Sequence, residues 1–306
     1  MATQDLGIDV AGPAPLRNAS PSRRIWRAAF ASTEFRVGLI LFTVLVLMAL
    51  LYPALSSIDP TKMNVAGRLQ APPFLGDKWS WSALLGTDQL GRDMLVRSLV
   101  GLRYSLLIGL STVVVMLAIG CTLGMLAGYY GGKIDMVIMR LTDAQLSIPM
   151  IILAITVLGV SRPTIPAIIL VLGLSSWPVY ARVMRSVVMT ERKSEYVRAA
   201  QVSGASTLRI MVTLLAPLVL PPIIFISVLD VARMMIFESI LGFIGLGVQP
   251  PTPTFGNIIA DGRKYLLNAW WIATMPGLFL CLTLTSINLM GASLERARNR
   301  IYGGVS

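Results

Sequence analysis

The chain has 306 residues, of which 55% are hydrophobic and only 13% charged, and its formal net charge is +11. Soluble domains carry about 25% charged residues, so this composition lacks a water-facing surface, and it also excludes disordered, collagen-like and disulfide-scaffold proteins. The basic residues are scattered between apolar stretches, which favours contact with anionic membrane lipid over nucleic acid, and the sequence therefore predicts an all-α integral membrane protein.

Several kinds of chemistry are missing from the sequence. There is no His, which excludes His-ligated metal sites and Ser-His-Asp triads. Cys121 and Cys281 lie within apolar stretches, where they are typical of small buried hydrophobic residues and not of a disulfide or metal pair. No GxxxxGK(S/T) phosphate loop occurs, so the chain is not expected to hydrolyse ATP itself. We expect no metal, no bound cofactor and no enzymatic activity.

The predicted elements follow from the gaps between charged residues. Residues 1–36 are polar and contain Pro and Arg, which predicts a tail and not a secretory signal. Seven uncharged windows come next, each long enough to cross a bilayer, which takes about 20 apolar residues. The windows are Val37–Ile58, Tyr104–Gly132, Ala144–Ser161, Pro163–Ala181, Ile210–Leu229, Ser239–Ala260 and Tyr265–Leu294. The sixth contains GFIGLGVQPPTPTFGN, too rich in Gly and Pro for a lipid-exposed backbone, so it is predicted to be a loop or re-entrant segment and six transmembrane helices remain.

An even number of spans places both termini on the same side of the membrane. Cytoplasmic termini leave more of the 26 Lys and Arg residues inside than outside, as the positive-inside rule requires. The predicted organisation is a cytoplasmic N-terminal tail (1–36), a first transmembrane helix (37–58), an extracytoplasmic segment (59–103), a five-helix core (104–294) and a cytoplasmic C-terminal tail (295–306).

One inner loop, residues 182–209, is long, basic and compatible with a helix. A solvated linker is the simplest interpretation of a charged loop, but the stretch SEYVRAAQVSGASTLRIMVTLLAPLVLPP carries a more specific pattern. Ser194 can cap a helix whose first turn holds Glu195, and Gly204 suits the left-handed residue that ends a helix. A short helix is therefore predicted at residues 194–204. The prolines that follow are predicted to bend the fifth span: Pro217, Pro221 and Pro222.

This stretch resembles the cytoplasmic signature of the inner-membrane permease subunits of bacterial ATP-binding-cassette importers. That signature reads Glu-Ala-Ala, three residues, Gly, nine residues, then Ile-x-Leu-Pro. Ala199, Ala200 and Gly204 match it at the same spacing, and Pro217 falls at the final Pro. Glu195 precedes the Ala pair by four residues, as it does in the oligopeptide/dipeptide branch of the family.

Two further stretches are similar to the second, C-type permease subunit of that branch. Leu84–Gly109, which reads LLGTDQLGRDMLVRSLVGLRYSLLIG, is similar to the segment before its second span. Glu238–Gly256, which reads ESILGFIGLGVQPPTPTFG, is similar to the stretch after its fifth span. Asp143 and Pro149 fit an Asp…Pro pair at the start of its third span. The resemblance covers about residues 84–303.

The resemblance implies a type I importer permease fold in the bacterial cell inner membrane and a non-catalytic permease subunit. A homologous permease would complete the translocation pathway, ATPase subunits that bind ATP and Mg would drive it, and an extracytoplasmic binding protein would deliver the substrate. The inner loop would couple the chain to the ATPase through these residues: Glu195, Ala199, Ala200, Gly204 and Pro217. Di- or oligopeptides are the expected substrates, and nickel chelates, glutathione and sugar derivatives remain open.

A stripe of glycines marks the second span. Gly120, Gly124 and Gly128 recur at four-residue spacing, which lets another helix pack closely against them. Packing within the chain is one interpretation, and the interface with the second permease is the other.

Charges near the interior of the fifth span are costly and often functional. Asp230 and Arg233 lie three residues apart and can share one helix face. They are interpreted either as a structural ion pair or as residues that face the translocation pathway or the permease partner. Glu238, near the outer end of this span, is expected to be solvated.

Two other classes of protein stay open. A secondary transporter driven by an ion gradient would explain the spans and Asp230 without an ATPase, although the two halves show no evident repeat. An intramembrane aspartyl enzyme could use Asp143 and Asp230, although neither lies in a Gly-x-Gly-Asp context.

Overall fold

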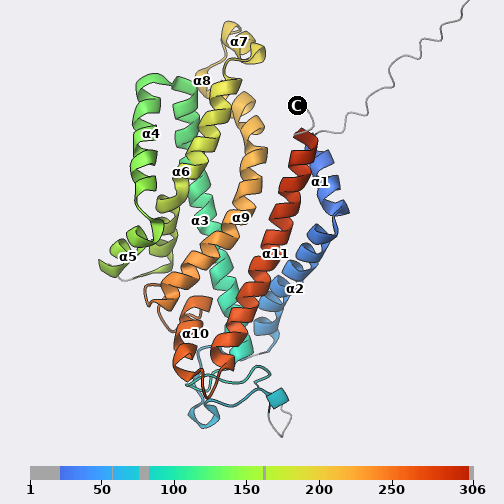
Figure 1. Ribbon diagram of the computed structural model, residues 1–306, viewed down its shortest axis with the longest axis vertical. Coiled ribbons are helices and arrows are strands. Elements are labelled where there is room, and N and C mark those ends of the chain that lie inside the picture. Colours follow the sequence, from blue (N-terminus) through green and yellow to red (C-terminus); the bar gives the residue numbers. More distant parts are fainter. Residues whose placement is uncertain (1–20, 57, 76–82, 161–162, 303–306) are drawn as a thin grey trace, which may run out of the picture.

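The computed structural model describes residues 21–56, 58–75, 83–160 and 163–302. Every regular element in these ranges is helical, and the longer helices run side by side through an elongated bundle (Figure 1). The α-helices are α1 (Pro21–Ala31), α2 (Thr33–Leu55), α3 (Met94–Tyr130), α4 (Gly132–Ser147), α5 (Met150–Val160), α6 (Ile165–Glu191), α7 (Glu195–Val202), α8 (Thr207–Arg209), α9 (Ala216–Phe243), α10 (Phe255–Gly262) and α11 (Trp271–Tyr302). The tighter or wider turns are η1 (Val65–Gly67), η2 (Pro73–Leu75), the π-helical η3 (Ile210–Leu215) and η4 (Arg263–Tyr265).

Within the described ranges, four helices are long and apolar enough to cross a membrane: α2, α3, α6 and α11. Two bent pairs add to them. Helices α4 and α5 meet at 83°, and the helical stretch Thr207–Leu220 meets Ile223–Phe243 at 62°. Counting each bent pair as one span gives up to six, which agrees with the predicted all-α architecture. The second bend falls at residues 221–222, where the prolines are expected to remove backbone donors.

The glycine stripe brings α3 and α6 into close contact. A Cβ at Gly120 would lie 2.5 Å from Tyr180 Cβ, and one at Gly124 would lie 2.4 Å from the Ala181 carbonyl oxygen. Gly128 meets Val188 in the same way, at 2.8 Å. The stripe is therefore covered by α6 of the same chain, which is the packing interpretation and leaves no room there for a second permease.

Both terminal regions are more ordered than the predicted tails. Helix α1 and the last turns of α11 lie at one end of the bundle, the end that also carries α7 (Figure 1). Ile25 and Ala29 of α1 pack with Leu294 and Ala297 of α11 in one apolar cluster. Within the predicted tails 1–36 and 295–306, residues 21–31, 33–36 and 295–302 are helical.

Three spanning helices extend beyond their predicted windows. Helix α3 begins at Met94 and not at residue 104, so the last ten residues of the predicted extracytoplasmic segment 59–103 belong to this helix. Helix α6 continues past residue 181 to Glu191, and α9 continues past residue 229 to Phe243. The windows stopped at charged residues that the fold accommodates inside helices: Arg182 pairs with Asp143, Asp230 pairs with Arg233, and Arg103 is exposed.

The third predicted span, residues 144–161, was wrong in position. Helix α4 begins at Gly132, and the chain breaks at Ile148 and Pro149 before α5. Pro149 restricts Ile148 before it to an extended backbone, which ends α4, and its carbonyl accepts the first hydrogen bonds of α5, from the Ile152 and Leu153 N–H groups at 3.0 and 3.2 Å. The two acidic residues of α4, which fell outside the uncharged window, are paired with α6. Arg182 Nη2 donates to Asp143 Oδ1 at 2.6 Å, and Arg185 Nη2 donates to Asp135 Oδ2 at 2.6 Å.

The opposite end of the bundle is closed by irregular chain. The segment before α3 and the segment containing α10 lie together there (Figure 1). Trp271 Nε1 donates to the Thr87 carbonyl oxygen at 3.1 Å, and the Thr87 hydroxyl donates to the Gly67 carbonyl oxygen at 2.6 Å. Met94, Ile258 and Trp271 form one apolar cluster beneath them. These contacts join the irregular segment that precedes α3 to α10 and to the start of α11.

Candidate coupling site and buried charges

Helix α7 is the short inner helix that the sequence predicts at residues 194–204. It spans Glu195–Val202, and Gly204 follows with a φ of +78°. The Ala205 N–H donates to the Ala200 carbonyl at 3.0 Å, and the Gly204 N–H donates to the Gln201 carbonyl at 3.0 Å. This pair of bonds is a Schellman motif, which requires a left-handed residue and explains the glycine. The Ser194 hydroxyl does not cap the helix, because it donates to the Glu191 carbonyl oxygen instead.

One side of α7 is anchored and the other is free. Val197 is fully buried in the main apolar core, and Ala200 packs partly against the same core. Glu195 and Ala199 are exposed, and Val202 is 90% exposed.

Polar contacts tie α7 to the ends of α3 and α6. Tyr196 donates its hydroxyl to Glu191 Oε2 at 2.8 Å, and partial burial raises the pKa of this phenol. Gln201 Nε2 donates to the Tyr129 hydroxyl at 3.4 Å, and Arg192 Nη1 donates to the Tyr129 carbonyl oxygen at 2.7 Å. The helix is thus held at a fixed place on the bundle.

Pro217 lies apart from the other predicted coupling residues. Glu195, Ala199, Ala200 and Gly204 belong to α7 or its C-terminal cap, whereas Pro217 is in the first turn of α9. The π-helical turns of η3 come directly before it. A proline ring clashes with the carbonyl four residues earlier, and widening the turn to π-helix relieves that clash.

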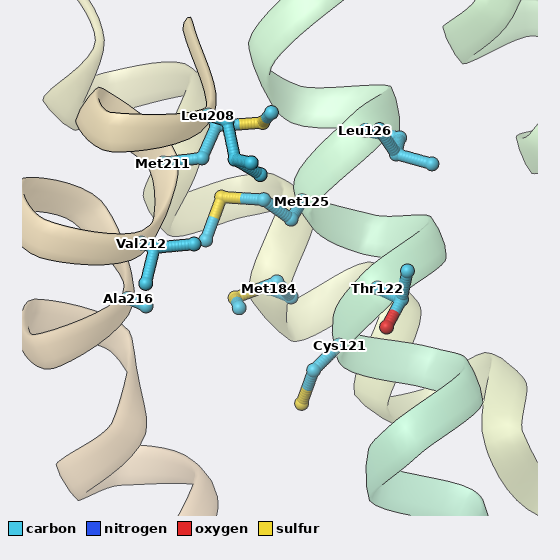
Figure 2. Close-up of a pocket in the computed structure, with 9 residues that line it drawn as sticks. All are labelled: Cys121, Thr122, Met125, Leu126, Met184, Leu208, Met211, Val212 and Ala216. Carbon is cyan, nitrogen blue, oxygen red and sulfur yellow. The ribbon is translucent and has the colours of Figure 1, made fainter. Parts of the chain in front are cut away.

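A pocket of about 260 Å³ separates η3 from α3 (Figure 2). Figure 2 shows Met125 of α3 extending toward Val212 of η3, whereas Leu126 points away from it, and three of the lining residues are methionines. The lining residues are Cys121, Thr122, Met125, Leu126, Met184, Leu208, Met211, Val212 and Ala216. The segment that follows α7 therefore does not pack tightly on α3, in contrast to α6.

Asp230 and Arg233 form an ion pair on α9. Asp230 is 1% exposed, and its Oδ1 lies 3.1 Å from Arg233 Nη1. The Tyr180 hydroxyl of α6 donates to the other carboxylate oxygen at 2.7 Å. The Arg233 side chain is 57% exposed, so only this member of the pair reaches the surface. Asp230 itself is held between α6 and α9 and positions the guanidinium.

Glu238 is not solvated, so the expectation for this residue was wrong. It is fully buried on α9, and the Ser105 hydroxyl of α3 donates to its Oε2 at 2.8 Å. The reason is that α9 continues to Phe243, which places Glu238 inside the bundle and not at its outer end. The carboxylate joins α9 to α3.

The turn before α3 forms a charged cluster, and no functional residue is predicted in it from the sequence. Asp88 accepts hydrogen bonds from the Arg92 N–H at 2.9 Å and from Arg92 Nε at 2.6 Å. Asp93 caps α3 by accepting from the Val96 N–H at 2.9 Å, and Arg97 is buried one turn later. Two acidic–basic pairs, each with a spacing of four residues and close to Gly91, were the signal that could have revealed it: Asp88 with Arg92 and Asp93 with Arg97.

Comparison with known proteins shows which family has this architecture. The family described as binding-protein-dependent transport system inner membrane component matches residues 120–300. The chain belongs to this family. The N-terminal transmembrane domain of oligopeptide transport permease C matches residues 20–73, which adds α1 and α2 to the family core. The protein is thus a multi-pass inner-membrane permease subunit, and the predictions of family, fold class and location are confirmed.

Several relatives are similar over most of their length. A di/tripeptide transport system permease protein DppC from Pseudomonas aeruginosa is 38% identical over 91% of both chains. A dipeptide transport system permease protein DppC from Haemophilus influenzae is 33% identical over 91% of this chain and 94% of its own. A probable D,D-dipeptide transport system permease protein DdpC from Escherichia coli is 34% identical over 87% of both.

A solved structure shares the fold. The MetNI methionine ABC transporter, in an inward-facing conformation, matches with a TM-score of 0.52 and 20% identity, over 67% of this chain and 96% of that one. The likeness supports the predicted type I importer permease fold. The family match and the named relatives favour an importer permease over the secondary-transporter and intramembrane-enzyme alternatives.

Proposed function

We propose that this chain is the non-catalytic permease subunit of an ATP-driven importer of di- or oligopeptides. The observation that carries the proposal is α7, a short helix at the end of the bundle with Val197 buried in the core and with Glu195, Ala199 and Val202 exposed. The names of the relatives support peptides as substrates.

The partners follow from the same reasoning. A second, homologous permease would complete the pathway, ATPase subunits would bind ATP and Mg and contact α7, and an extracytoplasmic binding protein would deliver peptide. Lipid covers the apolar outer faces, and nucleic acid has no role. The chain itself would bind no cofactor and no metal; none of its described residues forms a metal-binding group of His, Cys, Asp and Glu.

Movement of α7 would pass into the bundle through η3. When ATP draws the ATPase subunits together, the coupling helices approach one another and the spans move as rigid bodies. The pocket between η3 and α3 leaves space for such a movement, whereas the glycine stripe holds α3 and α6 together. Arg233 is our candidate for a residue that faces the pathway or the second permease, because an exposed cation in a spanning helix is costly against lipid.

The exposed face of α7 allows a sharp test. Ala199 is exposed and a Cβ at Gly204 would meet nothing within 4 Å, so bulk added at either position meets only a partner. We expect Ala199→Trp and Gly204→Val to leave membrane insertion intact, to reduce co-purification of the ATPase, and to break the dependence of ATP hydrolysis on substrate. Gly204→Val also carries a left-handed backbone cost of about 1 kcal/mol, which Ala199→Trp does not.

A matched control separates contact from general disturbance. Leu267 is 98% exposed in the loop before α11, at the end of the bundle opposite α7. Leu267→Trp therefore adds the same ring at a site away from α7. It should leave ATPase binding and coupled hydrolysis unchanged. Normal values for Ala199→Trp in both measurements would contradict the coupling role. Vanadate-resistant uptake of a labelled dipeptide would instead support transport driven by an ion gradient.

A further inference from the structure

A polar pocket of about 220 Å³ lies at the end of the bundle opposite α7. The turn before α3 forms one wall, and residues 250–252 with α10 form the other. Four of its lining residues carry the chemistry: Gln89, Arg92, Arg97 and Asp261.

The buried charges at this pocket are two arginines and one aspartate, and a second aspartate, Asp261, lies partly exposed at the rim. The Arg92 and Arg97 side chains are 6% and 4% exposed, and a single buried carboxylate, Asp88, lies between them. Asp88 Oδ2 is 2.6 Å from Arg92 Nε but 3.4 Å from Arg97 Nε. Asp261 is 3.9 Å from Arg92 and its side chain is 43% exposed, so water weakens its effect. Two buried guanidinium groups thus share one buried carboxylate.

Two buried polar groups at the pocket lack a hydrogen-bond partner among the described residues. The first is Arg97 Nε, whose side chain otherwise donates through Nη1 to the Pro60 carbonyl oxygen at 3.2 Å. The second is Gln89 Oε1. The Gln89 amide can rotate to present its NH2 group instead, so both residues can offer donors to one ligand. Buried groups left unpaired are costly, and a ligand would recover that cost.

We infer that this pocket binds a carboxylate group. Two buried guanidinium groups with one buried carboxylate between them favour an anion, and a planar carboxylate matches the donor geometry of guanidinium groups. The carboxylate could belong to the C-terminus of a peptide or to an acidic side chain of the binding protein, and this assignment of sources rests on the proposed function. In the peptide case, Asp261 at the rim of the pocket would face the ammonium group.

The first experiment tests carboxylate binding without requiring transport. The assembled transporter is placed in lipid nanodiscs, and its thermal unfolding is followed in sodium acetate and in sodium chloride at equal ionic strength. A bound ligand raises the unfolding temperature in proportion to its occupancy. We expect acetate and glycylglycine to raise it above the chloride value, and glycylglycinamide, which lacks the carboxylate, to have no such effect.

Substitutions at Gln89 make the test specific. Gln89→Glu places a carboxylate in the pocket, so it should raise the unfolding temperature by itself and weaken the acetate response at least about tenfold. Gln89→Ala should retain the response through Arg97. Lys264→Gln removes an exposed positive charge from the neighbouring loop and should also retain it. Equal effects of acetate and chloride, or an unchanged response in Gln89→Glu, would overturn the inference.

A second experiment distinguishes the two sources. Gln89→Cys, in a chain whose Cys121 and Cys281 are replaced by Ala, is treated with an aqueous thiol reagent. Protection by a dipeptide alone assigns the pocket to the peptide, and protection by the peptide-free binding protein assigns it to an acidic side chain. Protection by neither overturns the inference. Failure of the complex to assemble with an ATPase or to transport peptides would count against the proposed function, whatever the result with acetate.

Discussion

At the scale of single residues, Gly91 shows how closely the turn before α3 is built. Its φ is +74°, and a Cβ at this position would lie 1.8 Å from the Asn64 carbonyl oxygen. In the same turn, the Asp88 carboxylate accepts from the Leu90 N–H at 2.8 Å. The backbone can close over Asn64 only where no side chain intervenes, so the turn depends on glycine.

We expect Gly91→Ala to destabilise the protein more than Gly132→Ala. Both positions have a left-handed backbone, but a Cβ at Gly132 would meet nothing within 4 Å. Gly132→Ala should therefore cost only about 1 kcal/mol, and Gly91→Ala at least about 2 kcal/mol more, because the Asn64 backbone must move. Thermal unfolding of both variants in detergent measures the difference, and equal midpoints would contradict it.

The Asp230–Arg233 pair makes a second prediction at this scale. Arg233→Cys should react with an aqueous thiol reagent in at least one nucleotide state, because the arginine is exposed, whereas Asp230→Cys should not react, because the aspartate is buried. Both are made in the background without Cys121 and Cys281. An unreactive Arg233→Cys in every nucleotide state, together with normal transport by Arg233→Gln, would remove Arg233 from the pathway.

At the scale of elements, α6 and η3 contact α3 in different ways. Gly120 and Gly124 let α6 pack directly on α3, and bulk there would collide with backbone. No such contact joins η3 to α3, where the apolar pocket lies (Figure 2). The contrast divides the core into a rigid pair of helices and a segment that can shift against it.

Filling the pocket should therefore inhibit transport without unfolding the protein. We expect Ala216→Phe, which projects into the pocket, to lower the rate of peptide uptake at least severalfold while the unfolding temperature stays the same or rises. Leu218→Phe is the control, because Leu218 is 47% exposed on the same helix and does not line the pocket. Full uptake by Ala216→Phe would show that the space is not used.

The sequence predicted some elements well because their signals are local. Helix α7 is one example, since Glu195 at its start and Gly204 after its end act within a few residues. Helix α4 is the opposite case, because its charges are compensated by Arg182 and Arg185, about forty to fifty residues away. The burial of Glu238 likewise depends on Ser105, which is distant in sequence. Pairing across the fold is not visible in a count of charges.

At the scale of the whole molecule, the chain has two distinct ends. The end with α1, α7 and the C-terminal part of α11 is helical, and the other carries the irregular segments and α10 (Figure 1). The proposed function requires the first end to face the cytoplasm, where an ATPase would meet α7, and the positive-inside rule favours the same orientation.

Labelling of intact cells tests this orientation. In the chain without Cys121 and Cys281, we expect a membrane-impermeant maleimide to modify Leu267→Cys but not Asn299→Cys until the cells are opened. Both residues are exposed, and they lie at opposite ends of α11, because Leu267 precedes its first residue and Asn299 is in its last turn. Labelling of Asn299→Cys in intact cells would reverse the topology.

Helix α3 is much longer than a membrane is thick. Its 37 residues correspond to about 55 Å at 1.5 Å per residue, against about 30 Å of hydrocarbon. Its first turns hold Arg97 beside the polar pocket, and Tyr129 near its last turn holds Arg192 and Gln201. A straight rod pivoting about its middle by about 5° displaces both tips by about 2.4 Å in opposite directions. A single helix thus reaches from one face of the membrane to the other. A tilt of this helix on one side would move its other end as well, without a chain of side-chain contacts between the two faces.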